Sequence, residues 1–546
     1  MDLGPQHTTH RGAWYRCALR GPESESSRSP GSPTERCMRM TLMKSPTGTV
    51  LLALALALAG CASSGDDGPS QGGGAPGASS SAAAGSTSGT GSTSGTGSAA
   101  GSTSAAPGGT GGEGGAGAGG AGGEGGAGVG GAGGSAGGEP RIPWDWVGIV
   151  GTGQSLSVGA TPITTTTQPF KNLKLDLGSA SVPPWGPDHS ALSMVPLVEP
   201  IRSVDIMTGR PAYPANIYGE TPHSAMANQI SFLVQEAAGR DYVSVHTVVG
   251  ESGQAMSVIE KGATDSGTTG RAYAATLFEA EAIARLARAA GKTYGIGAIF
   301  MTHGETDWAS ATYQDDLVQL WNDYNADLAA LTGQTGGKIP MFVSQQHGFP
   351  FSANQRPAST LAQWRVGLEH PGDIVCTGPK YHLPAASDGL HLTAAGYKQL
   401  GEKYGQIYYE KVVMGRDWQP LQPTGAERSG RVITVHFHVP VPPLVWDDGM
   451  PAPRLWPDGR GFEVRQANTK VDITSVEISG SSVRITCASD LPASDVTVGY
   501  ALTTDSTPMP GGFRAWGHLR DSDPFVGWAT HVAQPNYAVA FEMPVP

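Results

Sequence analysis

An alternation of short apolar runs and amphipathic stretches between Pro140 and Gly415 most strongly constrains what this chain folds into. Apolar runs of strand length occur at residues 146–151, 243–250, 297–302 and 339–345. Between and after them, apolar residues recur at helical spacing in residues 223–238, 271–290, 313–331, 360–369 and 393–412. Strands that alternate with helices form a mainly parallel sheet covered on both faces. The pattern therefore predicts an α/β fold, a three-layer α/β/α sandwich.

The chain changes character after this region. Residues 431–439, 471–478 and 496–502 alternate apolar and polar side chains with period two, and prolines and glycines separate them. This pattern is typical of short antiparallel strands. We therefore expect an α/β domain at residues 140–416, followed by a small β-rich, sandwich-like domain at residues 417–546.

The N-terminal region carries the pattern of an export signal. The apolar run at residues 49–60 follows Arg36, Arg39 and Lys44, and it is too short for a comfortable transmembrane span. It ends in Leu-Ala-Gly-Cys61, which resembles the signal box of bacterial lipoproteins. The resemblance implies cleavage before Cys61, a lipid anchor on its thiol, and, with Ala62 next, the outer membrane or cell surface. An uncleaved apolar anchor is the alternative.

Residues 1–60 thus form the expected signal region, with a start placed too far upstream, because Met38, Met40 and Met43 lie closer to the apolar run. Residues 61–139 consist mostly of Gly, Ser, Ala and Thr. Such a segment buries too little apolar surface to offset its ordering entropy, so we expect a flexible tether after the lipidated cysteine. The formal net charge of −12, without a basic stripe, argues against a nucleic-acid partner.

A glycine-rich turn, Gly151-Thr-Gly-Gln-Ser-Leu-Ser-Val-Gly159, follows the first apolar run. A dinucleotide fingerprint fails because Leu156 stands where the third glycine should fall, and a Walker-type loop fails because no Gly-Lys-Ser/Thr follows. The Gly-x-Ser-x-Gly elbow fails because Ser157 occupies its last position. Ser155 remains a candidate nucleophile that needs a histidine base and an orienting carboxylate.

The best partners for Ser155 lie in Ala386-Ser-Asp-Gly-Leu-His-Leu-Thr-Ala-Ala-Gly396. Asp388 and His391 are three residues apart before an expected helix, so one turn can present both side chains to the same cleft. Thr393 is placed to cap that helix. An Asp-x-x-His pair also arises in a capping loop with a surface histidine, so the pair is informative only together with the serine.

Four segments, in this order, resemble the SGNH hydrolases, and among them the sialate O-acetylesterase branch of the carbohydrate esterases. They are Gly-Gln-Ser at 153–155, Val-Val-Gly-Glu-Ser-Gly-Gln-Ala-Met at 248–256, Met-Thr-His-Gly-Glu-Thr-Asp-Trp at 301–308 and Asp-Gly-Leu-His-Leu-Thr-Ala-Ala-Gly at 388–396. The resemblance spans residues 147–408 and implies a flavodoxin-like SGNH hydrolase fold. The first three segments follow expected strands, at the edge where ligands bind in such sheets.

The resemblance implies a role for each matching residue. Ser155 is the nucleophile, His391 the general base and Asp388 the carboxylate that orients it. The backbone amides of Ser155 and Gly253 face the developing oxyanion. The third oxyanion donor of the family is a side-chain amide, and this chain has His303 at that position, which either donates through a ring N–H or leaves the oxyanion hole weaker.

Further residues beside these have less specific roles. Gln154, Gly304 and Glu305 are candidates for bracing the site, Glu305 through hydrogen bonds to backbone amides. A carboxylate just after a strand also caps the next helix or braces a loop, and that alternative stays open for Glu305 and Asp307. Ser157 is a rival nucleophile two residues after Ser155.

The sequence predicts no metal site and no cofactor. No cluster of His, Cys, Asp and Glu has convincing metal-ligand spacing, and His436 and His438 are interpreted as an exposed pair on a strand. Cys376 and Cys487 either form a disulfide or remain two buried free thiols.

These features predict an exported serine esterase that removes acetyl groups from a carbohydrate or glycan. Its expected partners are an acetylated carbohydrate substrate and a membrane, through the lipid on Cys61. Two alternatives remain open. One is a catalytically weak or inactive carbohydrate-binding lipoprotein, which the histidine at position 303 keeps in consideration, and the other is a lipase or thioesterase of the same fold.

Overall fold

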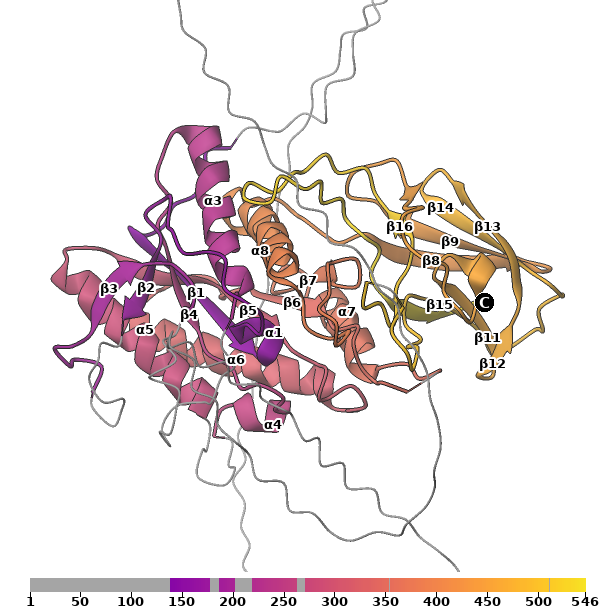
Figure 1. The fold of residues 1–546 in the computed structure, drawn as a ribbon, viewed down its shortest axis with the longest axis horizontal. Coiled ribbons are helices and arrows are strands. Elements are labelled where there is room, and N and C mark those ends of the chain that lie inside the picture. The colour runs from indigo at the N-terminus through magenta and orange to yellow at the C-terminus, as the bar shows by residue number, and fades with distance from the viewer. Residues whose placement is uncertain (1–137, 177–185, 202–218, 263–270, 353, 510) are drawn as a thin grey trace, which may run out of the picture. The chain divides into compact units, whose positions relative to one another are not determined.

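A seven-stranded sheet organises the first part of the described chain (Figure 1). The computed structural model describes residues 138–176, 186–201, 219–262, 271–352, 354–509 and 511–546. The expected signal region at 1–60, the expected lipidation site Cys61 and all but the last two residues of the expected tether lie outside the described residues. Export, lipidation and the tether therefore stay predictions.

The sheet has the strand order β3-β2-β4-β1-β5-β6-β7, and all neighbours run parallel except β2 and β3 at one edge. Four strands coincide with predicted apolar runs: β1 (Trp146–Gly153), β4 (Ser244–Val248), β5 (Tyr294–Thr302) and β6 (Met341–Gln345). Three more extend the sheet beyond the prediction: β2 (Leu173–Asp176), β3 (Ser193–Pro196) and β7 (Ile374–Pro379). The predicted α/β part with a mainly parallel sheet is confirmed.

Helices cover both faces of this sheet (Figure 1). On one face lie α3 (Pro222–Ala238) and α8 (Ala394–Tyr408), and on the other α5 (Arg271–Ala289), α6 (Tyr313–Thr332) and α7 (Ala358–Glu369). Side chains alternate along β1, so Ile149 belongs to the core under α3 and α8, whereas Val150 belongs to the core under α5 and α6. After α8 the chain continues as one π-helical turn, η1 (Tyr409–Val413).

The C-terminal part is β-rich, as predicted. One four-stranded antiparallel sheet has the order β13-β14-β9-β8 and another the order β12-β11-β15-β17, with a two-stranded ribbon of β10 and β16. The strands are β8 (Gln422–Ser429), β9 (Val432–His438), β10 (Val445–Trp446), β11 (Phe462–Gln466), β12 (Thr469–Val471), β13 (Ile473–Ser479), β14 (Ser482–Cys487), β15 (Val496–Tyr500), β16 (Leu519–Arg520) and β17 (Phe541–Pro544), and a short 3₁₀ turn, η2, spans Pro457–Gly459. Buried side chains of both four-stranded sheets form one hydrophobic core.

That core continues into the α/β part. Trp364 of α7, Cys376 of β7 and Tyr381 after β7 belong to the same cluster as the buried side chains of the C-terminal sheets. Polar contacts reinforce the junction, since Gln345 Nε2 donates to the carbonyl of Ala540 at 2.8 Å. The α/β part and the β-rich part are therefore joined by shared apolar packing.

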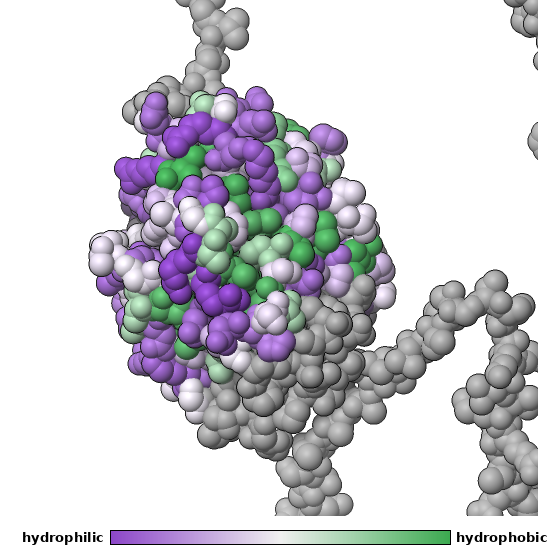
Figure 2. Space-filling view, turned by 90° about the vertical axis from the view of Figure 1, so that its left-hand side faces the viewer, coloured by the Kyte–Doolittle hydropathy of each residue, from purple (hydrophilic) through white to green (hydrophobic). Residues whose placement is uncertain are grey.

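The two cysteines of the described chain do not pair. Cys376 and Cys487 are both buried and free, and burial raises the pKa of their thiols to about 12 and about 11. On the face shown in Figure 2, hydrophobic residues occur in separate patches between hydrophilic ones. Among the helices that the structure describes, none is long and apolar enough to cross a membrane.

Candidate active site

Ser155 stands where β1 ends, at the first position of the one-turn helix α1 (Ser155–Val158). The turn is fixed by its backbone: the Gln154 N–H donates to the carbonyl of Thr302 on β5, and the Gln154 carbonyl accepts from the amides of Ser157 and Val158. The predicted glycine-rich turn is therefore the link between strand and helix. It holds Ser155 at the carboxyl edge of the sheet, largely buried.

The structure brings Ser155 together with the predicted partners His391 and Asp388. His391 Nε2 lies 2.8 Å from Ser155 Oγ, and His391 Nδ1 lies 2.6 Å from Oδ2 of Asp388. Since the carboxylate only accepts, Nδ1 carries the proton and Nε2 is free to accept from the serine hydroxyl. This is the arrangement of a nucleophile, a base and an orienting carboxylate.

The loop that carries Asp388 and His391 is closed by its own hydrogen bonds. Asp388 Oδ1 accepts from the backbone amides of Leu390 and His391 at 2.9 and 3.0 Å. Thr393 then caps α8, as predicted, by accepting from the amide of Gly396 at 3.1 Å.

The Asp388 carboxylate is held in its ionised form. Partial burial would raise its pKa, but hydrogen bonds from the His391 ring and from the amides of Leu390 and His391 outweigh that effect and lower the pKa to about 2. The carboxylate therefore remains a charged acceptor for the His391 ring over the whole neutral and mildly acidic range.

The backbone amides of Ser155 and Gly253 are available as donors. Within the residues that the structure describes, the N–H groups of Ser155 and Gly253 donate to no protein acceptor. Gly253 lies between β4 and the one-turn helix α4 (Met256–Ile259), in a left-handed conformation with φ of +71°. The sequence resemblance implies these two amides as oxyanion donors, and that role stays a prediction; donors of this kind stabilise charge that exists only in the transition state.

His303, the third implied donor, has no free N–H in this structure. Its ring is fully buried, Nε2 lies 3.0 Å from the carbonyl of Gln254, and Nδ1 lies 3.0 Å from the hydroxyl of Tyr313. A carbonyl only accepts, so Nε2 carries the proton and Nδ1 accepts from the tyrosine. His303 is thereby tied to the loop that contains Gly253, instead of pointing a ring donor at the reacting atoms.

The neighbours of His303 hold the same loop. Thr306 Oγ1 donates to the Gly253 carbonyl at 3.2 Å, and Asp307 Oδ2 accepts from the Met256 amide at 2.8 Å. Asp307 thus braces a loop at the start of α4, which is one of the alternatives left open by the sequence. The segment after β5 therefore clamps the segment after β4.

Gly304 and Gln154 contribute through their backbones. The carbonyl of Gly304 accepts from Ser359 Oγ on α7, and a Cβ at this position would lie 2.6 Å from Nε2 of Gln363. The side-chain oxygen of Gln154 has no hydrogen-bond partner within the described chain. Gln154 therefore braces the site through its main chain rather than its amide.

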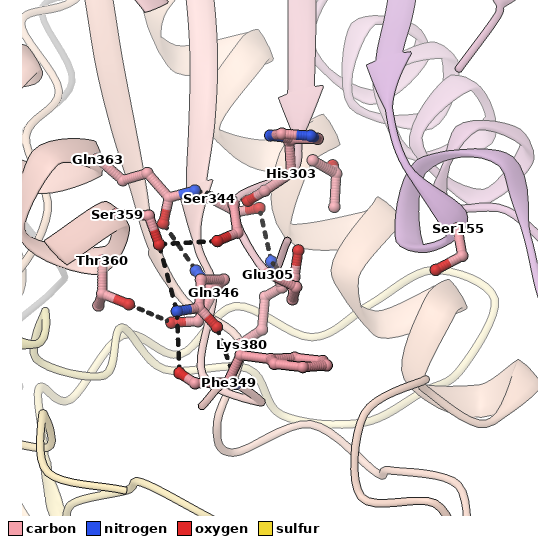
Figure 3. Close-up of polar contacts among 12 residues, drawn as sticks. Ser155, His303, Glu305, Ser344, Gln346, Phe349, Ser359, Thr360, Gln363 and Lys380 are labelled. Carbon is pink, nitrogen blue, oxygen red and sulfur yellow. Dashed lines mark hydrogen bonds and ion pairs between the residues drawn. The ribbon is translucent and has the colours of Figure 1, made fainter. Parts of the chain in front are cut away.

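Glu305 does not accept the backbone hydrogen bonds expected of it. Both of its carboxylate oxygens lack a hydrogen-bond partner among the described residues, and the side chain is buried. Its neighbour is Lys380, whose Nζ lies 3.5 Å from Glu305 Oε1 (Figure 3). Burial lowers the pKa of Lys380, and the adjacent carboxylate acts in the opposite direction. Glu305 is thus half of a buried ion pair.

Sequence reasoning missed Lys380. It lies directly after β7, which was not predicted as a strand, and its Nζ also lies 3.4 Å from Ser344 Oγ at the end of β6. The available signal was a lysine directly after a short apolar run. If that run is a strand of the parallel sheet, its carboxyl end lies at the same edge as the ends of the other strands, which places the lysine near the site.

The remaining predicted residues lie as follows. Ser157 is buried, and its hydroxyl has no partner within the described chain, so it is not engaged with His391. His436 contacts Ser482 Oγ at 2.9 Å on the neighbouring strand. Within the described ranges, no group of three or more His, Cys, Asp and Glu residues could hold a metal ion.

Comparisons with known proteins give only distant similarity. No protein-family model matches the chain, and no curated protein does. Among solved structures, the chain is similar to a carbohydrate acetylesterase from Xanthomonas citri, with a TM-score of 0.46, 12% identity, and coverage of 73% of this chain and 80% of that one. It is also similar to a protein from Arabidopsis thaliana (TM-score 0.35, 18% identity, 50% and 100% covered) and to NanS (0.28, 10%, 50% and 97%). These TM-scores are too low to carry an argument about function. The chemistry of the site is therefore inferred from the geometry of its own residues.

Proposed function

We propose that this protein is a serine esterase that removes acetyl groups from a carbohydrate, exported and anchored through Cys61. The observation that carries the reaction class is the line of hydrogen bonds from Ser155 Oγ to His391 Nε2 and from His391 Nδ1 to Asp388. Serine is a weak nucleophile unless a base takes its proton, and this geometry supplies the base and fixes its tautomer. The acetyl group and the sugar are inferred from the sequence resemblance to carbohydrate esterases.

The first half of the reaction forms an acyl-enzyme. Ser155 Oγ attacks the ester carbonyl while its proton passes to His391 Nε2. The negative charge on the carbonyl oxygen is stabilised by the amides of Ser155 and Gly253, each worth about 3 kcal/mol in such sites. His391 then gives its proton to the sugar oxygen, the C–O bond breaks, and the alcohol leaves.

The second half regenerates the enzyme. Water loses a proton to His391 Nε2 and attacks the acyl carbonyl, the same amides stabilise the new oxyanion, and acetate leaves as Ser155 regains its proton. Asp388 stays ionised throughout and stabilises the imidazolium that forms in each half.

Acetate release tests this function. The purified wild-type protein and the variants Ser155→Ala and Ser157→Ala would be compared on an aryl acetate and on acetylated xylan. We expect Ser155→Ala to lose at least about a thousandfold in kcat/KM, as removal of a triad member does, and Ser157→Ala to stay close to wild type. If wild type and Ser155→Ala release acetate at the same background rate, the enzyme proposal fails.

A panel of esters then separates the enzyme classes. Acetylated glycans, longer-chain aryl esters and a thioester would be compared by kcat/KM. Preference for acetylated glycans supports the carbohydrate esterase, and preference for long acyl chains supports the lipase or thioesterase alternative. Sugar binding without turnover supports the binding lipoprotein.

A further inference from the structure

The loop that carries Asp388 and His391, residues 385–391, is open to solvent on one side, and we call it the triad loop. The side chain of Asp388 is 49% exposed and that of His391 is 21% exposed. Burial therefore does little to fix these groups, although catalytic constellations need their side chains held within about 0.5 Å. Packing against the loop has to supply the remaining constraint.

The C-terminal β-rich part packs directly on this loop. A Cβ at Gly389 would lie 3.0 Å from Cγ of Pro508. A Cβ at Gly512 would lie 2.6 Å from Cβ of Ala385 and 3.3 Å from Cα of Gly389. The two backbones thus approach too closely for a side chain to stand between them.

The packing residues belong to a segment that is itself held in place. The amide of Asp505 donates to the carbonyl of Arg514 at 2.8 Å, and the amide of Met509 donates to the carbonyl of Phe513 at 2.9 Å. Thr504 Oγ1 donates to two carbonyls of the loop after β6, at 2.9 and 3.0 Å. Residues 504–509 and 511–514 are therefore held by hydrogen bonds on the side where the triad loop packs.

Arg514 adds a positive charge to this surface. Its Nη1 donates to the carbonyls of Asp505 and Ser506, and its Cζ lies 3.9 Å from the ring centre of Phe351. Burial lowers the pKa of Arg514, while the nearby carboxylates of Asp388 and Asp505 favour its charged form. The guanidinium is thus held in place by the carbonyls of Asp505 and Ser506 and by the Phe351 ring.

We propose that Pro508 and Gly512, together called the buttress, are positioning residues that hold the triad loop in register with Ser155. The β-rich part is then a structural component of the active site rather than a detachable accessory domain. This inference rests on the proposed function, because its consequence is the orientation of Asp388 and His391 in an ester-cleaving site.

Gly512→Ala tests the contact in the full chain. The new methyl group meets Ala385 and displaces the triad loop, so we expect kcat on an aryl acetate to fall about tenfold or more, with KM little changed, because small displacements of catalytic groups are costly. Gly512 has φ of +83°, so the substitution also strains the backbone. Gly480→Ala is the matched control, since Gly480 has φ of +62° and no atom within 4 Å of its Cβ position.

The double variant Ala385→Gly/Gly512→Ala removes the methyl group that the new one meets. We expect it to regain kcat to within about threefold of wild type while keeping the same backbone strain.

The proton NMR signal of the His391 Nδ1–H, recorded on the same proteins, reports the bond to Asp388 without any substrate. We expect this signal to shift or broaden in Gly512→Ala, to recover in the double variant and to stay unchanged in Gly480→Ala. If Gly512→Ala and Gly480→Ala show the same kcat and the same His391 Nδ1–H signal, the positioning role is overturned. A wild-type protein without esterase activity overturns the proposed function instead, and the NMR comparison still decides the positioning role.

Discussion

His391 Nε2 lies 2.8 Å from Ser155 Oγ, although the two residues are 236 positions apart in the sequence. The sheet accounts for this approach. β1 ends at Gly153, two residues before Ser155, and the strands beside it bring their carboxyl ends to the same edge, where the chain returns through the triad loop before α8. A short hydrogen bond across the fold, rather than a local motif, therefore defines the candidate site.

Asp388→Asn should lower kcat by about a hundredfold to ten-thousandfold, because an amide in place of the carboxylate favours the wrong tautomer of His391. Steady-state kinetics on an aryl acetate measures this, with Ser387→Ala as the control for a change in an exposed neighbour. An Asp388→Asn variant with wild-type kcat would show that this carboxylate does not orient the base.

The pH profile of the wild type should show no ionisation of Asp388 between pH 4 and pH 7. The pKa of Asp388 is lowered from 3.8 to about 2, so its charge and the hydrogen bonds that depend on it are fully present above about pH 4 and are lost only as the pH falls toward 2. The acid limb of kcat/KM above pH 4 should therefore contain no contribution from Asp388, and its limiting slope should not exceed one. A slope of two in this window would mean that a second group, such as the carboxylate, titrates there.

His303→Ala should lower kcat by about tenfold to a hundredfold with little change in KM. The ring fixes the Gln254 carbonyl next to Gly253, and misplacing one oxyanion donor costs at most about a thousandfold. Tyr313→Phe removes only the hydroxyl that donates to Nδ1, so we expect a smaller loss. A His303→Ala variant that changes KM and leaves kcat intact would instead place this histidine in substrate binding.

Lys380→Met should destabilise the fold by about 3–5 kcal/mol, because it leaves the Glu305 carboxylate buried and unpaired. The double variant Lys380→Met/Glu305→Leu removes both charges and should recover most of that loss. Urea unfolding measures both. Lys171→Met is the control, since Lys171 and Asp241 form an exposed pair, with side chains 68% and 60% exposed, and such pairs contribute little. If the free energy of unfolding of Lys380→Met equals or exceeds that of the double variant, the two buried charges do not stabilise each other.

The architecture of the α/β part could be predicted because most of its central strands are apolar and buried on both faces. β1, β5 and β6 contain few polar residues to obscure the pattern, whereas in β4 the buried polar residues Ser244, His246 and Thr247 alternate with or adjoin valines. β3 is the edge strand and β2 lies beside it, and apart from the buried Leu175 their side chains are half-buried or exposed, so both strands lack that signal. β7 ends in Gly378-Pro379, which by itself indicates a turn.

The candidate site could be predicted in part. Ser155, Asp388 and His391 stand in segments with a recognisable pattern, and the structure brings them together. The ion pair of Glu305 with Lys380 depends on how β5 and β7 are arranged across the sheet, which local sequence does not record. The contact of Gly512 with the triad loop likewise depends on how the β-rich part packs on the α/β part, which local sequence does not record either.

Covalent labelling of Ser155 tests the central claim most directly. An alkyl phosphonofluoridate reacts with a serine that a neighbouring base activates, and peptide mapping by mass spectrometry locates the adduct. We predict one adduct on the peptide that contains Ser155, absent in Ser155→Ala, retained in Ser157→Ala and formed much more slowly in His391→Ala. A wild-type protein that takes up no label, or a label that persists in Ser155→Ala, would contradict the claim that the chemistry starts at this oxygen.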